Sequence, residues 1–316
     1  MFADDTNIFV EGQTVAEAYA KGNELLRFVQ RYMLLNKLHI NMSKCCYIHF
    51  KPRTSSCEPS NNSALYIDQF PIKKVKETKF LGVIIDERLS WESHITALRR
   101  KLNYASATLY RIRDSLPKHL RKDLYHTLYE SHLSYCISVW GGCALYKTAR
   151  LWVSQKQCIR LLFGDKEAFL DKFRTAARAR PLANQLLGED FYRLEHTKPL
   201  FKEHNILIFK NLYVFHTYME LFKVLKLRQP MVIFDQLKIS DRKPDLIISD
   251  IPAEHFISKS TKIWNTLTPK LKVADYSLKI NTMKINLKRQ LLLLQNSDDP
   301  LIWTSNNFNM EKMPAL

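Results

Sequence analysis

The segment Phe2-Ala3-Asp4-Asp5-Thr6-Asn7-Ile8-Phe9-Val10 places two adjacent carboxylates directly before an apolar run with high β propensity. This pattern predicts a β-hairpin with Asp4 and Asp5 at its turn. Paired acids at such a turn suit Mg²⁺, because this hard cation takes oxygen ligands and two such ions sit between carboxylates of neighbouring strands. Taken alone, the pair is better explained as an exposed turn near the chain terminus. A metal-binding role for Asp4 and Asp5 therefore depends on further motifs downstream.

The segment up to residue 88 combines one helix pattern with several short strand patterns. Thr14-Val15-Ala16-Glu17 is a capping box, which predicts the start of a helix. Apolar residues at helical spacing continue the helix to about Leu35; they are Val15, Ala18, Leu25, Val29 and Met33. Strands are predicted at 47–50 and 80–85, a small hairpin at 64–72, and a loop at 51–62, which is rich in Pro, Ser and Asn. This part is therefore predicted to be α+β, with short antiparallel strands plus a helix.

From Ser90 onward the apolar residues follow a helical period. Steps of three and four residues form one apolar seam, made of Ile95, Leu98, Leu102, Ala105, Leu109, Ile112 and Leu116. Pro117 breaks this helix, and a second helix is predicted from Lys118 to Trp140, where two glycines stop it. Further helices are predicted at 151–163, 199–227 and 278–295, with a proline-punctuated connector at 229–252. This larger part is predicted to be mainly α.

The composition excludes several classes of protein. The chain has 316 residues, of which 46% are hydrophobic and 11% aromatic, so it can bury a core and is not disordered as a whole. It has only 7 glycines and contains neither a dinucleotide-binding fingerprint nor a P-loop. Its 6 cysteines form no C-x-x-C pair, which argues against a disulfide framework or a zinc ribbon.

The expected location is intracellular and away from the membrane. No apolar run reaches the roughly 20 residues of a membrane span. Asp4 and Asp5 occupy positions where a signal peptide would carry basic residues. No block of Lys and Arg is long enough for a persuasive nuclear signal, so nucleus and cytoplasm both stay open.

The chain is strongly basic, with 48 Lys and Arg against 31 Asp and Glu and a formal net charge of +17. Basic residues concentrate at 99–122, 147–180 and 270–289, on segments predicted to be helical. A polyanion, foremost nucleic acid, is the natural partner, because pairing phosphates with Lys and Arg releases condensed counterions. A solvated basic face is the alternative. The candidate contacts are Arg99, Arg100, Lys101, Arg111, Arg113, Lys118, Arg121, Lys122, Lys156 and Arg160.

The order of motifs resembles reverse transcriptases of non-LTR (LINE-type) retrotransposons, in particular those of jockey- and CR1-like elements. Phe2-Ala3-Asp4-Asp5 is similar to the metal-binding hairpin motif of the polymerase palm. Asn36-Lys37-Leu38 looks like the next palm motif, and Lys79-Phe80-Leu81-Gly82 opens a strand that looks like the primer grip. Weaker similarity continues through Leu133-Ser134-Tyr135-Cys136 and Gln155-Lys156-Gln157-Cys158.

This resemblance implies a division of the chain and a chemistry. Residues 1–88 would be a partial palm, 89–143 thumb-like helices, 144–295 a C-terminal helical region and 296–316 a tail. The family reaction is RNA-directed DNA synthesis by two-metal nucleotidyl transfer with Mg²⁺, acting on RNA and DNA. Asp4 would be a metal ligand, Asp5 its supporting neighbour, and Lys79, Phe80, Leu81 and Gly82 the primer grip.

The resemblance also implies a further metal ligand, an aspartate, that has no match in this sequence. In the family, an aspartate on an earlier palm strand holds the metals together with the residue matching Asp4, and the fingers also come earlier. We therefore expect the isolated chain to be inactive, unless an unknown partner supplies the rest of the palm, and whether it is an enzyme stays open. The alternatives are a non-catalytic RNA- or DNA-binding protein and the product of a decayed element without a selected role.

Overall fold

The computed structural model describes residues 6–51, 64–164, 197–239, 246–247, 255–271 and 278–296. It divides into two compact units, Met1–Ser93 and His94–Leu316. Helices predominate, and the few strands are short and pair two at a time, so the described residues have an α+β fold with a large helical share. None of the described helices is both long and apolar enough to cross a lipid bilayer.

The first unit contains one long helix, α1 (Val15–Leu35), as predicted. Thr14 caps it by accepting a hydrogen bond from the Glu17 backbone N–H at 3.2 Å, and the Glu17 carboxylate accepts one from Gln13 N at 2.9 Å. Gly22 lies close to Leu65, because a Cβ on Gly22 would be 2.9 Å from Leu65 Cδ2. The capping box and the small residue thus fix where α1 begins and where it meets the sheet residues.

The short strands of this unit form three separate pairs. β2 (Tyr66–Ile67) and β3 (Phe70–Pro71) are antiparallel, which confirms the predicted hairpin around residues 68 and 69. β1 (Cys46–Tyr47) pairs with β4 (Lys73–Lys74) in parallel, so the expectation of only antiparallel strands was wrong for this pair. β1 is also shorter than predicted, because its ladder with β4 covers only two residues.

The predicted single strand at 80–85 was wrong. The structure has a hairpin there, with β5 (Glu77–Phe80) antiparallel to β6 (Val83–Asp86). The connection is Leu81–Gly82, with φ of 46° and 84°. Positive φ at both central residues is what a two-residue turn requires if it is to match the twist of the strands, and glycine adopts it without steric cost. The apolar character of Leu81 disguised this turn in the sequence.

The predicted hairpin at the beginning of the chain is not seen in the part that is described. Asp4 and Asp5 lie outside the described residues, and Ile8, Phe9 and Val10 have no strand structure. Phe9 is 78% exposed. A strand needs a partner backbone to bond its N–H and C=O groups, and no described segment pairs with these residues. High β propensity alone was therefore insufficient.

The helical unit begins with the predicted amphipathic seam. α2 (Glu92–Ile112) buries Ile95, Leu98, Leu102, Ala105 and Leu109, and a single 3-10 turn, η1 (Arg113–Ser115), follows it. The predicted second helix is interrupted, because Cys136 has a left-handed backbone with φ of 50°. Its pieces are α3 (Lys118–Leu124), the π-helical turn η2 (Tyr125–Glu130), α4 (Ser131–Ser134) and α5 (Ile137–Trp140). α6 (Leu145–Phe163) follows and begins six residues earlier than predicted at Leu151.

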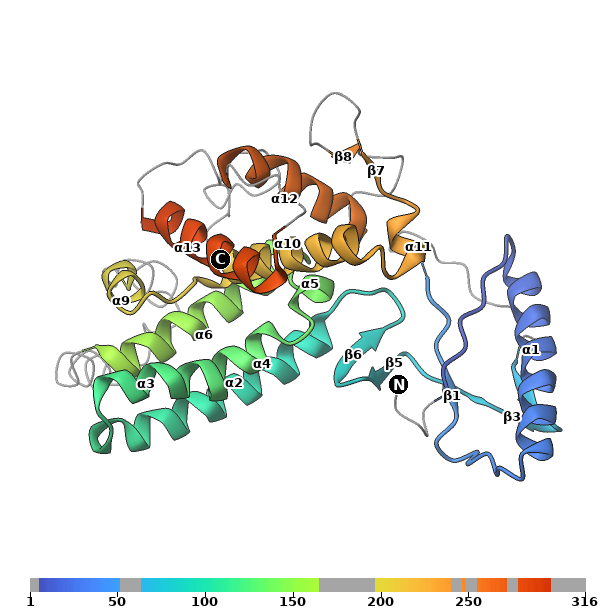
Figure 1. The fold of residues 1–316 in the computed structure, drawn as a ribbon. Coiled ribbons are helices and arrows are strands. Elements are labelled where there is room, and N and C mark those ends of the chain that lie inside the picture. The colour runs from blue at the N-terminus through green and yellow to red at the C-terminus, as the bar shows by residue number, and fades with distance from the viewer. Residues whose placement is uncertain are drawn as a thin grey trace. The chain divides into compact units, whose positions relative to one another are not determined.

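The C-terminal helices surround α10 (Phe209–Leu227), which is buried along nearly its whole length. Figure 1 shows α10 between α5 and α6 on one side and α12 (Phe256–Leu271) and α13 (Ile280–Asn296) on the other. α9 (Lys198–Glu203) is separated from α10 by a bend, so the predicted continuous helix at 199–227 was wrong. The remaining elements are α11 (Met231–Phe234) and the pair β7 (Lys238–Ile239) and β8 (Leu246–Ile247).

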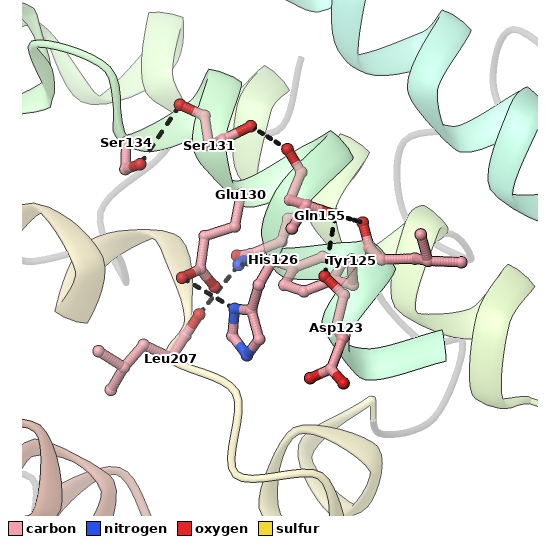
Figure 2. Close-up of polar contacts among 10 residues, drawn as sticks. Asp123, Tyr125, His126, Glu130, Ser131, Ser134, Gln155 and Leu207 are labelled. Atoms are coloured by element: carbon pink, nitrogen blue, oxygen red, sulfur yellow. Dashed lines mark hydrogen bonds and ion pairs between the residues drawn. The ribbon is translucent and has the colours of Figure 1, made fainter. Parts of the chain in front are cut away.

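Two glutamines hold the bend that leads into α10. The Gln155 amide donates to Tyr125 Oη and to Leu207 O, both at 2.9 Å (Figure 2). Its oxygen accepts from Phe209 N at 2.7 Å. Gln295 donates to Ile206 O and accepts from Ile208 N, both at 3.0 Å. α10 has no side-chain cap of its own, so these two amides satisfy backbone groups that burial would otherwise leave unpaired.

Candidate nucleic-acid interface

The solvent-facing side of α2 carries the candidate nucleic-acid contacts that are best exposed. Arg99, Arg100, Lys101 and Arg111 are all exposed. Helical geometry places Arg100 and Arg111 opposite the buried apolar seam, and Arg99 and Lys101 on its two flanks. No hydrogen bond or ion pair joins these four side chains to another described residue. The only acid of α2 is Glu92, in its first turn. We call Arg99, Arg100, Lys101 and Arg111 the α2 basic face, a set of four cations free to pair with phosphates.

Arg113 is not part of this face, and the structure gives it a different role from the one predicted. Its side chain is only 9% exposed. Its guanidinium donates to Leu161 O and, at 3.2 Å, to Gly164 O, and it forms an ion pair with Asp114. The last carbonyls of α6 lack partners within the helix and carry its negative dipole end, so Arg113 stabilises the end of α6.

Arg121 acts in the same region. Its Nε donates to Leu116 O at 3.0 Å and its Nη1 to Leu162 O at 3.2 Å. The structure therefore assigns two of the ten predicted contacts to holding α2, α3 and α6 together. A count of basic residues cannot separate these two arginines from exposed ones, because the α6 and Gly164 carbonyls that they bind lie more than forty residues away in sequence. Lys122 is half-buried, and the side chain of Lys118 lies outside the described residues.

Lys156 and Arg160 form a second, half-buried pair of cations on α6. The Lys156 ammonium lies 4.5 Å from the centroid of the Trp152 ring, in a cation–π contact. Burial lowers the pKa of Lys156, and the nearby positive charge of Arg160 lowers it further. Burial also lowers the pKa of Arg160.

The four residues predicted as a primer grip lie together at one hairpin tip. Lys79 and Phe80 end β5, and Leu81 and Gly82 form the turn. Lys79, Leu81 and Gly82 are exposed, whereas Phe80 is half-buried. The hairpin thus offers a cation and an exposed backbone turn to solvent. Their proposed contact with a primer stays a prediction.

Asp86, at the end of the same hairpin, shapes the connection toward α2. Its carboxylate accepts hydrogen bonds from Arg88 N at 3.1 Å, Ser90 N at 3.0 Å and Trp91 N at 2.9 Å. Burial by itself would raise the pKa of this carboxyl, but the three backbone hydrogen bonds outweigh it and lower the pKa. Asp86 therefore acts as an ionised hydrogen-bond acceptor that orders the backbone of residues 88–91.

The candidate metal site cannot be built from the part of the chain that is described. Asp4 and Asp5 lie outside it, and the described residues contain no group of three or more His, Cys, Asp or Glu able to hold a metal ion. The Mg²⁺ site therefore stays a prediction.

One residue that sequence reasoning missed lies within the α2 basic face. Tyr104 is 78% exposed and stands one turn after Arg100. The signal was present in the sequence, because Tyr104 is a large aromatic residue on the polar side of a predicted amphipathic helix.

Comparison with curated proteins finds polymerases of mobile elements. The RNA-directed DNA polymerase from mobile element jockey of Drosophila melanogaster is 25% identical over 167 residues, which are 52% of this chain and 18% of that protein. The jockey polymerase of Drosophila funebris is 25% identical over 170 residues, with the same two shares of 52% and 18%. The resemblance to non-LTR reverse transcriptases is confirmed. The probable RNA-directed DNA polymerase from transposon X-element of Drosophila melanogaster is 26% identical over 128 residues, 40% of this chain and 14% of that protein.

The similarity to jockey-type polymerases has a limited extent. The chain spans less than a fifth of the length of the jockey relatives it matches, since the matched part is 18% of each. No protein-family model matches the chain, and no solved structure does.

Proposed function

We propose that this chain acts as a nucleic-acid-holding part of a jockey-type RNA-directed DNA polymerase, and that the α2 basic face binds the phosphate backbone. The observation that carries the proposal is the set of four exposed cations on one helix without a partner among the described residues. A basic face that served only solubility would be expected to mix both signs of charge. The names of the relatives make RNA and DNA the first polyanions to test.

The binding would be electrostatic and would not read base sequence. Contacts to phosphates position a protein on nucleic acid without carrying sequence information. If all four cations pair with phosphates of a duplex, log Kd should vary with log salt with a slope of about 3.6. The half-buried Lys156 and Arg160 would add to this slope if they contact the same strand.

The catalytic part of the proposal rests on the resemblance alone. Asp4 would be a Mg²⁺ ligand and Asp5 its neighbour, and bound Mg²⁺ would supply charge stabilisation for nucleotidyl transfer. We expect the 316-residue chain by itself not to extend a primer, because no aspartate of this sequence matches the family's earlier palm aspartate. Template-dependent extension that Asp4→Ala abolishes would overturn this expectation.

The binding proposal is tested by titrating a labelled RNA–DNA hybrid with the purified chain at several salt concentrations. One variant carries Arg99→Gln, Arg100→Gln, Lys101→Gln and Arg111→Gln. The control variant loses the same charge at exposed positions of α9, α13 and the residue before it, by glutamine at Lys202, Lys279, Lys284 and Arg289. We expect the α2 variant to bind at least ten-fold more weakly with a shallower salt slope. Equal losses in the two variants would contradict a specific role for α2. The proposed function would be refuted if the unaltered chain bound neither the hybrid nor a single-stranded oligonucleotide.

A further inference from the structure

The α2 basic face contains one exposed aromatic ring, which charge alone does not require. Tyr104 is 78% exposed, and it makes no ring contact or hydrogen bond with another described residue. Its neighbours on the helix surface, three and four residues earlier, are Lys101 and Arg100. The structure therefore gives no packing reason for this side chain.

The surroundings of Tyr104 leave its ring accessible. Ala107, three residues later on the same surface, is exposed and small. Long side chains of a helix lean toward its N-terminus, so the ring is expected over the turn that carries Arg100 and Lys101. Arg111, seven residues later, extends the basic surface beyond the ring. The arrangement is an aromatic platform with a cation on both sides along the helix.

We propose that Tyr104 stacks on an unpaired base of single-stranded RNA or DNA while Arg100 and Lys101 pair with the adjoining phosphates. The proposal rests on the proposed function and names its substrate class. A duplex offers its backbone to the cations, but its bases are already stacked on one another, so the ring adds little there. A single strand offers both phosphates and free base faces, and stacking on an aromatic ring tolerates any base. The α2 basic face is thereby selective for single strands or single-stranded overhangs.

The test compares a single-stranded oligonucleotide with a duplex of the same length, using Tyr104→Ala, Tyr104→Phe and Arg100→Gln. A stacked base is worth about 1–3 kcal/mol, so Tyr104→Ala should weaken single-strand binding by about 5-fold to about 150-fold and leave its salt slope unchanged. Tyr104→Phe should bind as the unaltered chain does. Arg100→Gln should reduce the salt slope by about 0.7 for the single strand.

The matched control is Tyr146→Ala on α6, because Tyr146 is also exposed, at 54%, but lies on a different helix. It should leave single-strand binding unchanged. If Tyr104→Ala weakens single-strand and duplex binding equally, or weakens neither while the unaltered chain binds both, the stacking proposal is overturned and the proposed function stands. If the unaltered chain binds neither, the proposed function itself fails. Circular dichroism of each variant checks that α2 is still helical.

Discussion

Replacing Gln155 by leucine should destabilise the helical unit strongly. Gln155 is fully buried and makes three hydrogen bonds, to Tyr125 Oη, Leu207 O and Phe209 N. Leucine has a similar size but no polar atoms, so the variant leaves a phenol, a carbonyl and an amide unpaired inside the unit. Each unsatisfied buried group costs about 1–3 kcal/mol.

The sum for three independent groups would be about 3–9 kcal/mol, and local relaxation reduces it to about 3–5 kcal/mol. Native domains are stable by about 5–15 kcal/mol, so the loss would be a large fraction of the total. Urea unfolding monitored by tryptophan emission measures it, because Trp140 and Trp264 are buried in this unit. The urea midpoint should fall by about 1–2 M.

The control for this experiment is Gln157→Leu, on the same helix but at a half-buried position outside the network. It should change the free energy of unfolding by less than about 1 kcal/mol. A second variant, Gln155→Leu with Tyr125→Phe, removes the orphaned phenol and should recover about 1 kcal/mol. If Gln155→Leu and Gln157→Leu unfold at the same urea concentration, the network does not stabilise the bend before α10 and the reasoning is refuted.

Three further predictions concern the helix end, a buried histidine and the hairpin tip. Arg113→Met should destabilise the helical unit by about 2–3 kcal/mol in urea unfolding, because it leaves the carbonyls at the end of α6 without a donor. Arg111→Met, at an exposed position, should cost less than about 0.5 kcal/mol, and equal effects would contradict the role of Arg113 at the end of α6. Burial lowers the pKa of His94 to about 4, with the charge of Lys101 adding, so the unfolded chain takes up this proton first as the pH falls. The free energy of unfolding, measured by urea titration, should therefore decline as the pH falls from about 6.5 to about 4. His94→Phe should make this decline shallower, whereas His132→Phe, at an exposed position, should leave it unchanged. Gly82→Ala should destabilise the first unit by about 1 kcal/mol in urea unfolding because φ there is 84°, and an unchanged midpoint would show that the turn tolerates a side chain.

Local patterns in the sequence predicted the long helices α1 and α2 correctly. The capping box at Thr14 placed the start of α1, and the steps of three and four residues placed the buried seam of α2. The capping box and the apolar spacing each involve residues close together in sequence, so they can be recognised without knowing the tertiary structure.

The failures of prediction arose where a partner distant in sequence decides the outcome. The residues around Phe9 have strand propensity but no described partner strand, and the positive φ of Leu81 turned a predicted strand into a hairpin. Within the candidate site, charge counting found the α2 basic face but included Arg113, whose carbonyl partners lie at the end of α6. Charge counting also missed Tyr104, because this exposed residue is aromatic and carries no charge.

The sequence by itself determined the family resemblance, the basic character of the chain and the faces of its long helices, because motif order, composition and period are local properties. The tertiary structure decided which cations are free. Arg111 lies in the last turn of α2 and is exposed. Arg113, two residues later in η1, is buried and donates hydrogen bonds to the backbone carbonyls of Leu161 and Gly164 at the end of α6. The physical reason is that a buried guanidinium must pair with acceptors, and only the fold brings those acceptors within reach.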